Sequence, residues 1–117
     1  MNEVQIMTAA RTAYEVVRCY KEFYAEPTDG GWDELEETVR HKHIVAIQEI
    51  LKRKSITPET VHQLWIESMA KLGWKYGPAK SDIDKTHPCL IDYNELDDRD
   101  KVKDVIFLAA IRGVLAI

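Results

Sequence analysis

The chain has 117 residues, of which 45% are hydrophobic and 31% charged, and its formal net charge is −4. This length supports one domain, 1–117, with one core, and this composition is that of a globular protein. The acidic balance argues against a general binder of nucleic acid or of anionic membranes, since both show a basic excess. No apolar run approaches the roughly 20 residues that span a bilayer, and the charged first turns exclude a signal-peptide core. We therefore expect a cytoplasmic protein.

Residues 4–24 are predicted to form the first helix. Apolar residues recur there at three- and four-residue spacing, which places them in one stripe on a helix surface. The stripe contains Met7, Ala10, Tyr14, Val17 and either Phe23 or Tyr24. Residues 26–31 end this helix, because their proline cannot continue it and their Asp-Gly-Gly run favours turns.

A second helix is predicted to begin near Asp33. Asp33 and Glu36 have the spacing of a capping box, with Asp33 at the N-cap. The helical face that follows contains Trp32, Leu35, Val39, His43, Ala46, Ile47, Ile50 and Leu51. The basic run at residues 52–54 suits the C-terminal end of a helix dipole and is expected to face solvent.

The third helix is predicted to start with Thr57 as N-cap and Pro58 as its first residue. Its inward-facing residues are expected to be Val61, Leu64, Trp65, Ser68 and Met69. Gly73 is a suitable residue to follow the C-terminal end of this helix. Residues 74–96 are predicted to be a loop, with one or two short strands around residues 75–76 and 90–91.

A fourth helix is predicted to follow the polar cluster at residues 94–98. Its buried face contains Val102, Val105, Ile106, Ala109 and Ile111, and Gly113 ends or loosens it. The apolar tail at residues 114–117 is expected to pack on the core or on a second subunit. The fold class is therefore mainly α, with four helices and a structured, aromatic-rich loop between the third and the fourth.

The histidines, carboxylates and thiols give no catalytic set, no metal site and no cofactor site. His41 and His43 are two residues apart, so a helix points them to different faces. His62 has no ligand partner one turn further on and is expected at the surface. Residues 82–84 lack the glycine and the glutamate of a calcium-binding EF-hand loop. Cys89 is expected to be a buried structural thiol, because no base and oxyanion site accompany it.

The most distinctive stretch is residues 65–96, which holds two Trp, two Tyr, two Gly and two Pro. Aromatic rings with nearby cations can bind a planar, anionic molecule, and a glycine lets backbone approach it closely. Alternatively, the rings form a small core that holds the segment together, and both interpretations stay open. The candidate ligand- or partner-binding residues are Trp74, Tyr76, Gly77, Lys80, Lys85, His87 and Tyr93. Trp74 or Tyr76 would supply stacking and the lysines charge, whereas Trp65 is assigned to the core.

Two motifs in this stretch resemble the RyR domain. They are Gly73-Trp74-Lys75-Tyr76-Gly77-Pro78 and His87-Pro88-Cys89-Leu90-Ile91-Asp92-Tyr93. The RyR domain is a repeat of the cytoplasmic part of ryanodine receptors, the intracellular calcium-release channels, and it also occurs in stand-alone bacterial and phage proteins. The resemblance is strongest over residues 57–103, and the chain looks like a single-repeat protein of the microbial or phage type.

The resemblance implies a compact helical unit with short strands, which the channels use in tandem pairs away from the pore. Channel function is not transferred, because this chain carries one repeat. A lone repeat could pair with itself as a homodimer, and microbial members have been suggested to sense a nucleotide-like ligand or to act as adaptors. We therefore expect a non-enzymatic binding or interaction module. The alternatives are a structural homodimer that binds protein partners and, with least support, an enzyme.

Overall fold

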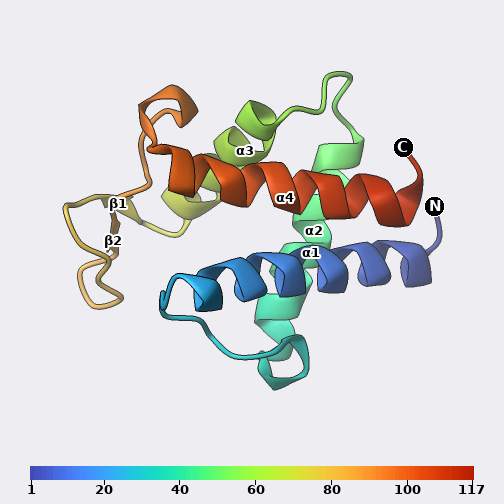
Figure 1. Ribbon diagram of the computed structural model, residues 1–117, viewed down its shortest axis with the longest axis horizontal. Helices are drawn as coiled ribbons and strands as arrows, with labels where there is room; N and C mark the ends of the chain where they lie inside the picture. The colour runs from blue at the N-terminus through green and yellow to red at the C-terminus, as the bar shows by residue number, and fades with distance from the viewer.

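The computed structural model describes residues 1–117 and is mainly helical, as Figure 1 shows. The four helices are α1 (Glu3–Phe23), α2 (Glu37–Leu51), α3 (Pro58–Lys71) and α4 (Asp98–Leu115). Between α3 and α4 lie the strands β1 (Lys75–Tyr76) and β2 (Thr86–His87). Two 3₁₀ turns, η1 (Trp32–Glu34) and η2 (Tyr93–Glu95), precede α2 and α4. The predicted mainly α fold, with short strands between the third and fourth helices, is confirmed.

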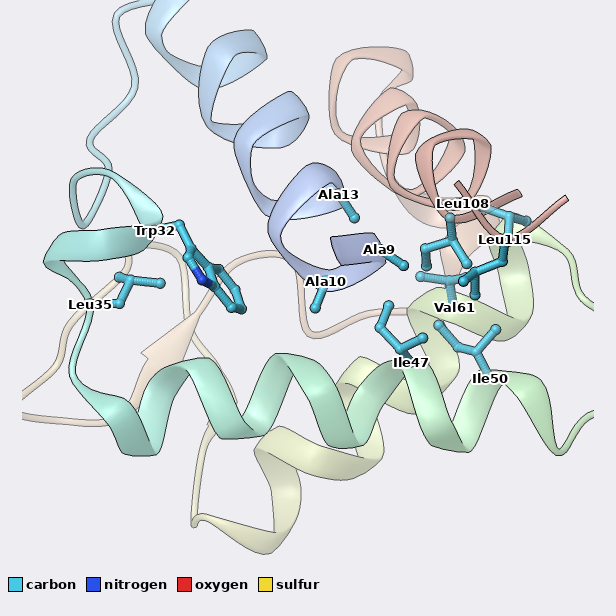
Figure 2. Packing of buried hydrophobic residues seen from close by; sticks show 11 residues of the cluster. Ala9, Ala10, Ala13, Trp32, Leu35, Ile47, Ile50, Val61, Leu108 and Leu115 are labelled. Atoms are coloured by element: carbon cyan, nitrogen blue, oxygen red, sulfur yellow. The ribbon is translucent and has the colours of Figure 1, made fainter. Parts of the chain in front are cut away.

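Helices α1 and α4 lie side by side and run in opposite directions, which brings the two termini to the same end of the molecule (Figure 1). The two helices pack closely because α1 presents short side chains: Ala9, Ala10 and Ala13 have no exposed surface. Helix α2 crosses this pair, and Figure 2 shows its Ile47 near the α1 alanines. The core therefore lies where α1, α2 and α4 meet, and α3 adds to it from one side.

The predicted apolar stripe of α1 is only partly correct. Ala10 is fully buried, but Met7 is 49% exposed and Phe23 is 82% exposed. The buried face also contains Ala9 and Ala13, which a search for large apolar residues does not find. Small residues mark this face because they allow a neighbouring helix to approach closely, whereas Met7 and Phe23 are left outside and Ile6 and Tyr14 pack at the edge of the core.

Helix α2 begins at Glu37, and the predicted capping box at Asp33 is wrong. Its N-cap is Glu36, whose side chain makes no capping hydrogen bond. Residues 32–34 form η1 instead, which buries Trp32 to 4% exposure against the ring of Tyr14. The packing of Trp32 therefore determines the backbone conformation of residues 32–34, and Asp33 remains on the surface.

The predicted ends of α3 are confirmed. The Thr57 hydroxyl accepts a hydrogen bond from the backbone N–H of Thr60 at 3.2 Å, and Pro58 is the first helical residue. Gly73 follows the helix with a φ of +86°, a left-handed conformation that glycine adopts without strain.

The C-terminal end of α4 differs from the prediction. Gly113 lies inside the helix, which continues to Leu115, because the buried Leu115 packs on the core and keeps the last turn in place. Ile117 remains 46% exposed. None of the four helices has the combination of length and hydropathy that a membrane crossing requires.

Candidate functional site

Strands β1 and β2 pair in parallel and define the loop of residues 74–87. Lys75 pairs with Thr86 and Tyr76 with His87, and an antiparallel bridge joins Ser81 to Thr86. The first predicted strand is therefore confirmed. The second, around residues 90–91, is wrong, because the carbonyl of Ile91 accepts a hydrogen bond from α3 instead of from a strand.

Gly77 is buried inside this loop. A Cβ atom at this position would lie 2.5 Å from the Cβ of Thr86, closer than real side chains approach. The Thr86 hydroxyl in turn donates to the carbonyl of Ala79 at 2.9 Å. The close approach that requires a glycine here is thus to Thr86, within the loop.

Lys85 fastens the loop to the end of α3. Its Nζ donates to the carbonyl of Leu72, the C-cap residue of α3, at 3.0 Å. A cation at this position suits the negative end of the helix dipole. Lys85 also has a φ of +54°, so the same residue turns the backbone into β2.

His87 is half-buried and its orientation is fixed on two sides. Its Nδ1 accepts the backbone N–H of Cys89 at 3.0 Å, and its ring meets the edge of Trp65 with 5.0 Å between centroids. In the neutral ring the proton therefore sits on Nε2, which has no protein acceptor. Burial, followed by the charges of Lys80, Lys21 and Lys103, lowers the pKa of His87 to about 4.

Tyr76 and Lys80 both face solvent, as does Lys85. Tyr76 is 57% exposed, and the exposed Lys80 forms no ion pair. Trp74, one residue before β1, is half-buried. These three residues and His87 all belong to the 74–87 loop.

Tyr93 lies apart from this group, in η2. It lines an open cleft of about 420 Å³ between α3 and η2, together with His62, Gln63 and Asp92. None of the other six candidate residues lines this cleft. The structure thus divides the seven candidates into a loop group and one outlying tyrosine.

His62 is buried to 3% exposure, so its predicted surface position is wrong. Its Nε2 donates to the Ile91 carbonyl at 2.7 Å, and its Nδ1 lies 3.4 Å from the Asp104 carboxylate. Burial lowers the pKa of His62, but Asp104 and the Ile91 carbonyl raise it by more, and the net shift is upward. No local pattern could reveal this site, because its two acceptors come from distant parts of the chain.

Cys89 is half-buried, and its thiol is held in the protonated form. Burial, followed by the charge of Asp100, raises the pKa of Cys89 to about 12. A thiol with this pKa supplies almost no thiolate near neutral pH. This environment is that of a structural cysteine.

Lys21, in the last turn of α1, is a charged neighbour that the sequence did not point to. Burial, Lys103 and Lys80, in that order, lower its pKa. Burial and Lys21 likewise lower the pKa of His43 on α2. Cationic groups from α1, α4 and the 74–87 loop therefore act on one another at this end of the molecule.

The RyR domain family model matches residues 37–115, more than half of the chain. This chain belongs to the RyR domain family. The match runs from the first residue of α2 to the last residue of α4, so it covers the whole 74–87 loop. Helix α1, with Lys21 and the buried alanines, lies outside the matched segment.

Proposed function

We propose that this RyR domain is a non-enzymatic binding module for a small, planar, anionic ligand of the nucleotide type. The ligand binds at the exposed face of the 74–87 loop, in a cytoplasmic setting. The observation that carries this proposal is that one loop presents both the exposed ring of Tyr76 and the unpaired charge of the exposed Lys80. An exposed aromatic face accepts a stacked base, and a neighbouring ammonium group attracts a phosphate.

The chemistry of the remaining side chains supports binding rather than catalysis. The Cys89 thiol is protonated over the whole physiological range, since its pKa is about 12. Both ring nitrogens of His62 already face protein acceptors. Neither group is free to act as a nucleophile or as a general base.

Thermal unfolding in the presence of nucleoside monophosphates, triphosphates and cyclic nucleotides tests the proposal. A ligand at a hundredfold excess over its dissociation constant stabilises the folded state by about 2.7 kcal/mol. We expect Tyr76→Ala to remove this gain. Ile83→Ala is the matched control, because Ile83 is 94% exposed on the same loop. If no nucleotide changes the melting temperature of the wild-type chain, the proposal fails.

A second candidate function is self-association as a structural homodimer that binds protein partners. It is favoured by an apolar groove of about 440 Å³ between the end of α2 and the two termini, lined by Met1, Ile6, Leu51, Ile56 and Ile117. Met1 and Ile117 of this groove are 60% and 46% exposed. A second copy of this face would cover it.

Sedimentation velocity over a range of protein concentrations tests the homodimer. Ile117→Asp is expected to shift the population to the monomer at little cost in stability, because Ile117 lines the groove and is already 46% exposed. Ile83→Asp adds the same charge on the distant loop and should leave the dimer intact. A wild-type chain that stays monomeric at high concentration rules this candidate out.

A further inference from the structure

We propose that the cleft between α3 and η2 binds a small organic dication, a molecule with an amine or guanidinium group at each end. This inference goes beyond the proposed function, because it concerns a ligand of opposite charge at a separate place. No residue of the 74–87 loop lines the cleft. Its volume of about 420 Å³ lies within the range of about 300–1,000 Å³ that is usual for small-molecule sites.

The walls of the cleft come from three segments of the chain. Glu59, Gln63 and Glu67 lie one turn apart and form a row along α3. Residues 92–94 line the cleft from the start of η2, and Arg53 lines it from the segment that follows α2. The cleft is therefore a product of the fold, because these segments lie far apart in the sequence.

The η2 wall is held in place by the buried His62, which also lines the cleft. Its Nε2 donates to the carbonyl of Ile91, directly before the wall, at 2.7 Å. Its ring meets the edge of the Tyr93 ring with 6.0 Å between centroids. A wall fixed in this way needs little ordering when a ligand binds, which favours affinity.

The lining of the cleft carries an excess of negative charge. Glu59, Glu67 and Asp92 supply three carboxylates, and Arg53 supplies one guanidinium group. None of these four groups forms an ion pair within the protein. Two negative charges are therefore in excess, and a concave surface concentrates their field. A ligand with two positive ends neutralises this excess.

The other charged groups around the cleft leave this balance unchanged. A proton on His62 is matched by the carboxylate of Asp104, 3.4 Å from its Nδ1. The positive end of the α3 dipole is partly satisfied, because the Thr57 hydroxyl accepts one of its free N–H groups. Burial, followed by the charges of Glu59 and Asp104, raises the pKa of Tyr93, as expected for a phenol in negative surroundings.

The uncharged lining groups suit the same ligand. The side-chain oxygens of Thr60, Gln63 and Asn94 can accept hydrogen bonds from ammonium or guanidinium N–H groups. The half-buried ring of Tyr93 already lies 5.7 Å from the Nζ of Lys101, a distance at which an aromatic ring attracts a cation. An anion would meet three carboxylates instead, and an apolar molecule would leave these polar groups without partners.

Titration of the full chain with agmatine, followed by backbone amide chemical shifts, tests the cleft. Agmatine carries a guanidinium group at one end and an amine at the other. We expect saturable shifts concentrated at residues 59–67 and 92–94, and none there with succinate, a short dianion. Binding that does not saturate by about 10 mM agmatine, or shifts confined to other residues, overturns the proposal.

Matched variants separate the cleft from a general attraction of cations to an acidic protein. Glu59→Gln and Asp92→Asn should each weaken agmatine binding by about threefold or more. Glu95→Gln removes the same charge from η2 outside the cleft and should bind as the wild type does. Arg53→Gln should tighten binding, because it removes the competing cation, whereas Lys54→Gln on the next residue should not.

All five replaced side chains are exposed and form no ion pair, so these variants are expected to remain folded. Equal effects of Glu59→Gln and Glu95→Gln, or weaker binding in Arg53→Gln, overturn the proposal.

The cleft and the proposed nucleotide site are tested separately by Tyr76→Ala. This variant should lose nucleotide binding and keep the agmatine affinity of the wild type, because Tyr76 does not line the cleft. Agmatine binding that is lost in Tyr76→Ala would assign the cation to the 74–87 loop and overturn the cleft. Agmatine binding in the cleft without any nucleotide binding keeps the cleft and overturns the proposed function.

Discussion

The imidazole of His62 ties three segments of the chain together. It sits on α3, donates to the Ile91 carbonyl at 2.7 Å, and faces the Asp104 carboxylate of α4 at 3.4 Å. The ring also packs against Trp65 and Tyr93. With an acceptor at each nitrogen, the protonated ring satisfies both partners at once, whereas the neutral ring satisfies one.

Replacing His62 should therefore destabilise the fold. In His62→Leu, the Ile91 carbonyl and the Asp104 carboxylate lose their partner, which we expect to cost about 2 kcal/mol in urea unfolding. The folded pKa of His62 is raised, so its contribution is fully present below the unfolded value of 6.5 and is lost as the pH rises through the folded value. The deficit of the variant should accordingly be larger at pH 6 than at pH 9. His41→Leu, on the exposed side of α2, is the control; a matching loss there would contradict this role.

His87 should give the stability of the protein the opposite pH dependence. Its folded pKa is about 4, against 6.5 for the free group, so the unfolded chain takes up the proton first as the pH falls. Stability is thus lost between pH 6.5 and about 4, by up to about 3 kcal/mol for this residue. His87→Asn keeps an acceptor for the Cys89 N–H and should flatten the acid side of the curve of unfolding free energy against pH. If the unfolding free energy of His87→Asn falls as steeply with decreasing pH as that of the wild type, His87 is not the group responsible.

Two glycines test how the elements between α3 and the C-terminus are built. In Gly77→Ala the new methyl group meets Thr86, with 2.5 Å between the Cβ atoms, so we expect a loss of about 1–3 kcal/mol as β1 and β2 are pushed apart. In Gly113→Ala, inside α4, nothing lies within 4 Å of the new Cβ, and the helix should gain up to about 1 kcal/mol. Chemical denaturation of the two variants measures both effects. A tolerated Gly77→Ala would mean that the loop repacks freely.

The elements that the sequence predicted correctly are those with local causes. Thr57 and Pro58 specify the start of α3 through contacts within one turn, and Gly73 specifies its end in the same way. The start of α2 was missed because Trp32 is buried by tertiary contacts, which pull residues 32–34 into η1. The position of strand β2 was predicted wrongly for the same reason, because its pairing with β1 is a tertiary contact that the sequence of neither segment reveals.

The residues of the candidate site likewise divide into those that a local motif reveals and those that only tertiary packing brings into place. The family motifs contain Tyr76 and His87, so the sequence could point to the 74–87 loop without any knowledge of its shape. Lys21 belongs to no motif, and only the packing of α1 brings its charge to bear on His87. The burial of His62 could not be predicted either, since its acceptors on Ile91 and Asp104 are provided by the fold.

On the scale of the whole molecule, α1 is part of the core even though the family match begins at α2. Ala9, Ala10 and Ala13 are fully buried and belong to the same cluster as Leu108 and Ile111 of α4. The RyR-matched segment therefore buries its α4 face only with the help of α1.

Ala13→Leu should therefore destabilise the whole protein in one cooperative transition. The larger side chain has no room between α1 and α4, where Figure 2 shows Ala13, and overpacking of this kind costs about 1–3 kcal/mol. Ala109→Leu makes the same change on the exposed side of α4 and should leave stability within about 0.5 kcal/mol of the wild type. Urea unfolding followed by far-UV circular dichroism and by tryptophan fluorescence should give coincident transitions for both variants. A fluorescence transition that stays at the wild-type midpoint in Ala13→Leu, while helical signal is lost earlier, would mean that α1 unfolds independently of the remaining helices.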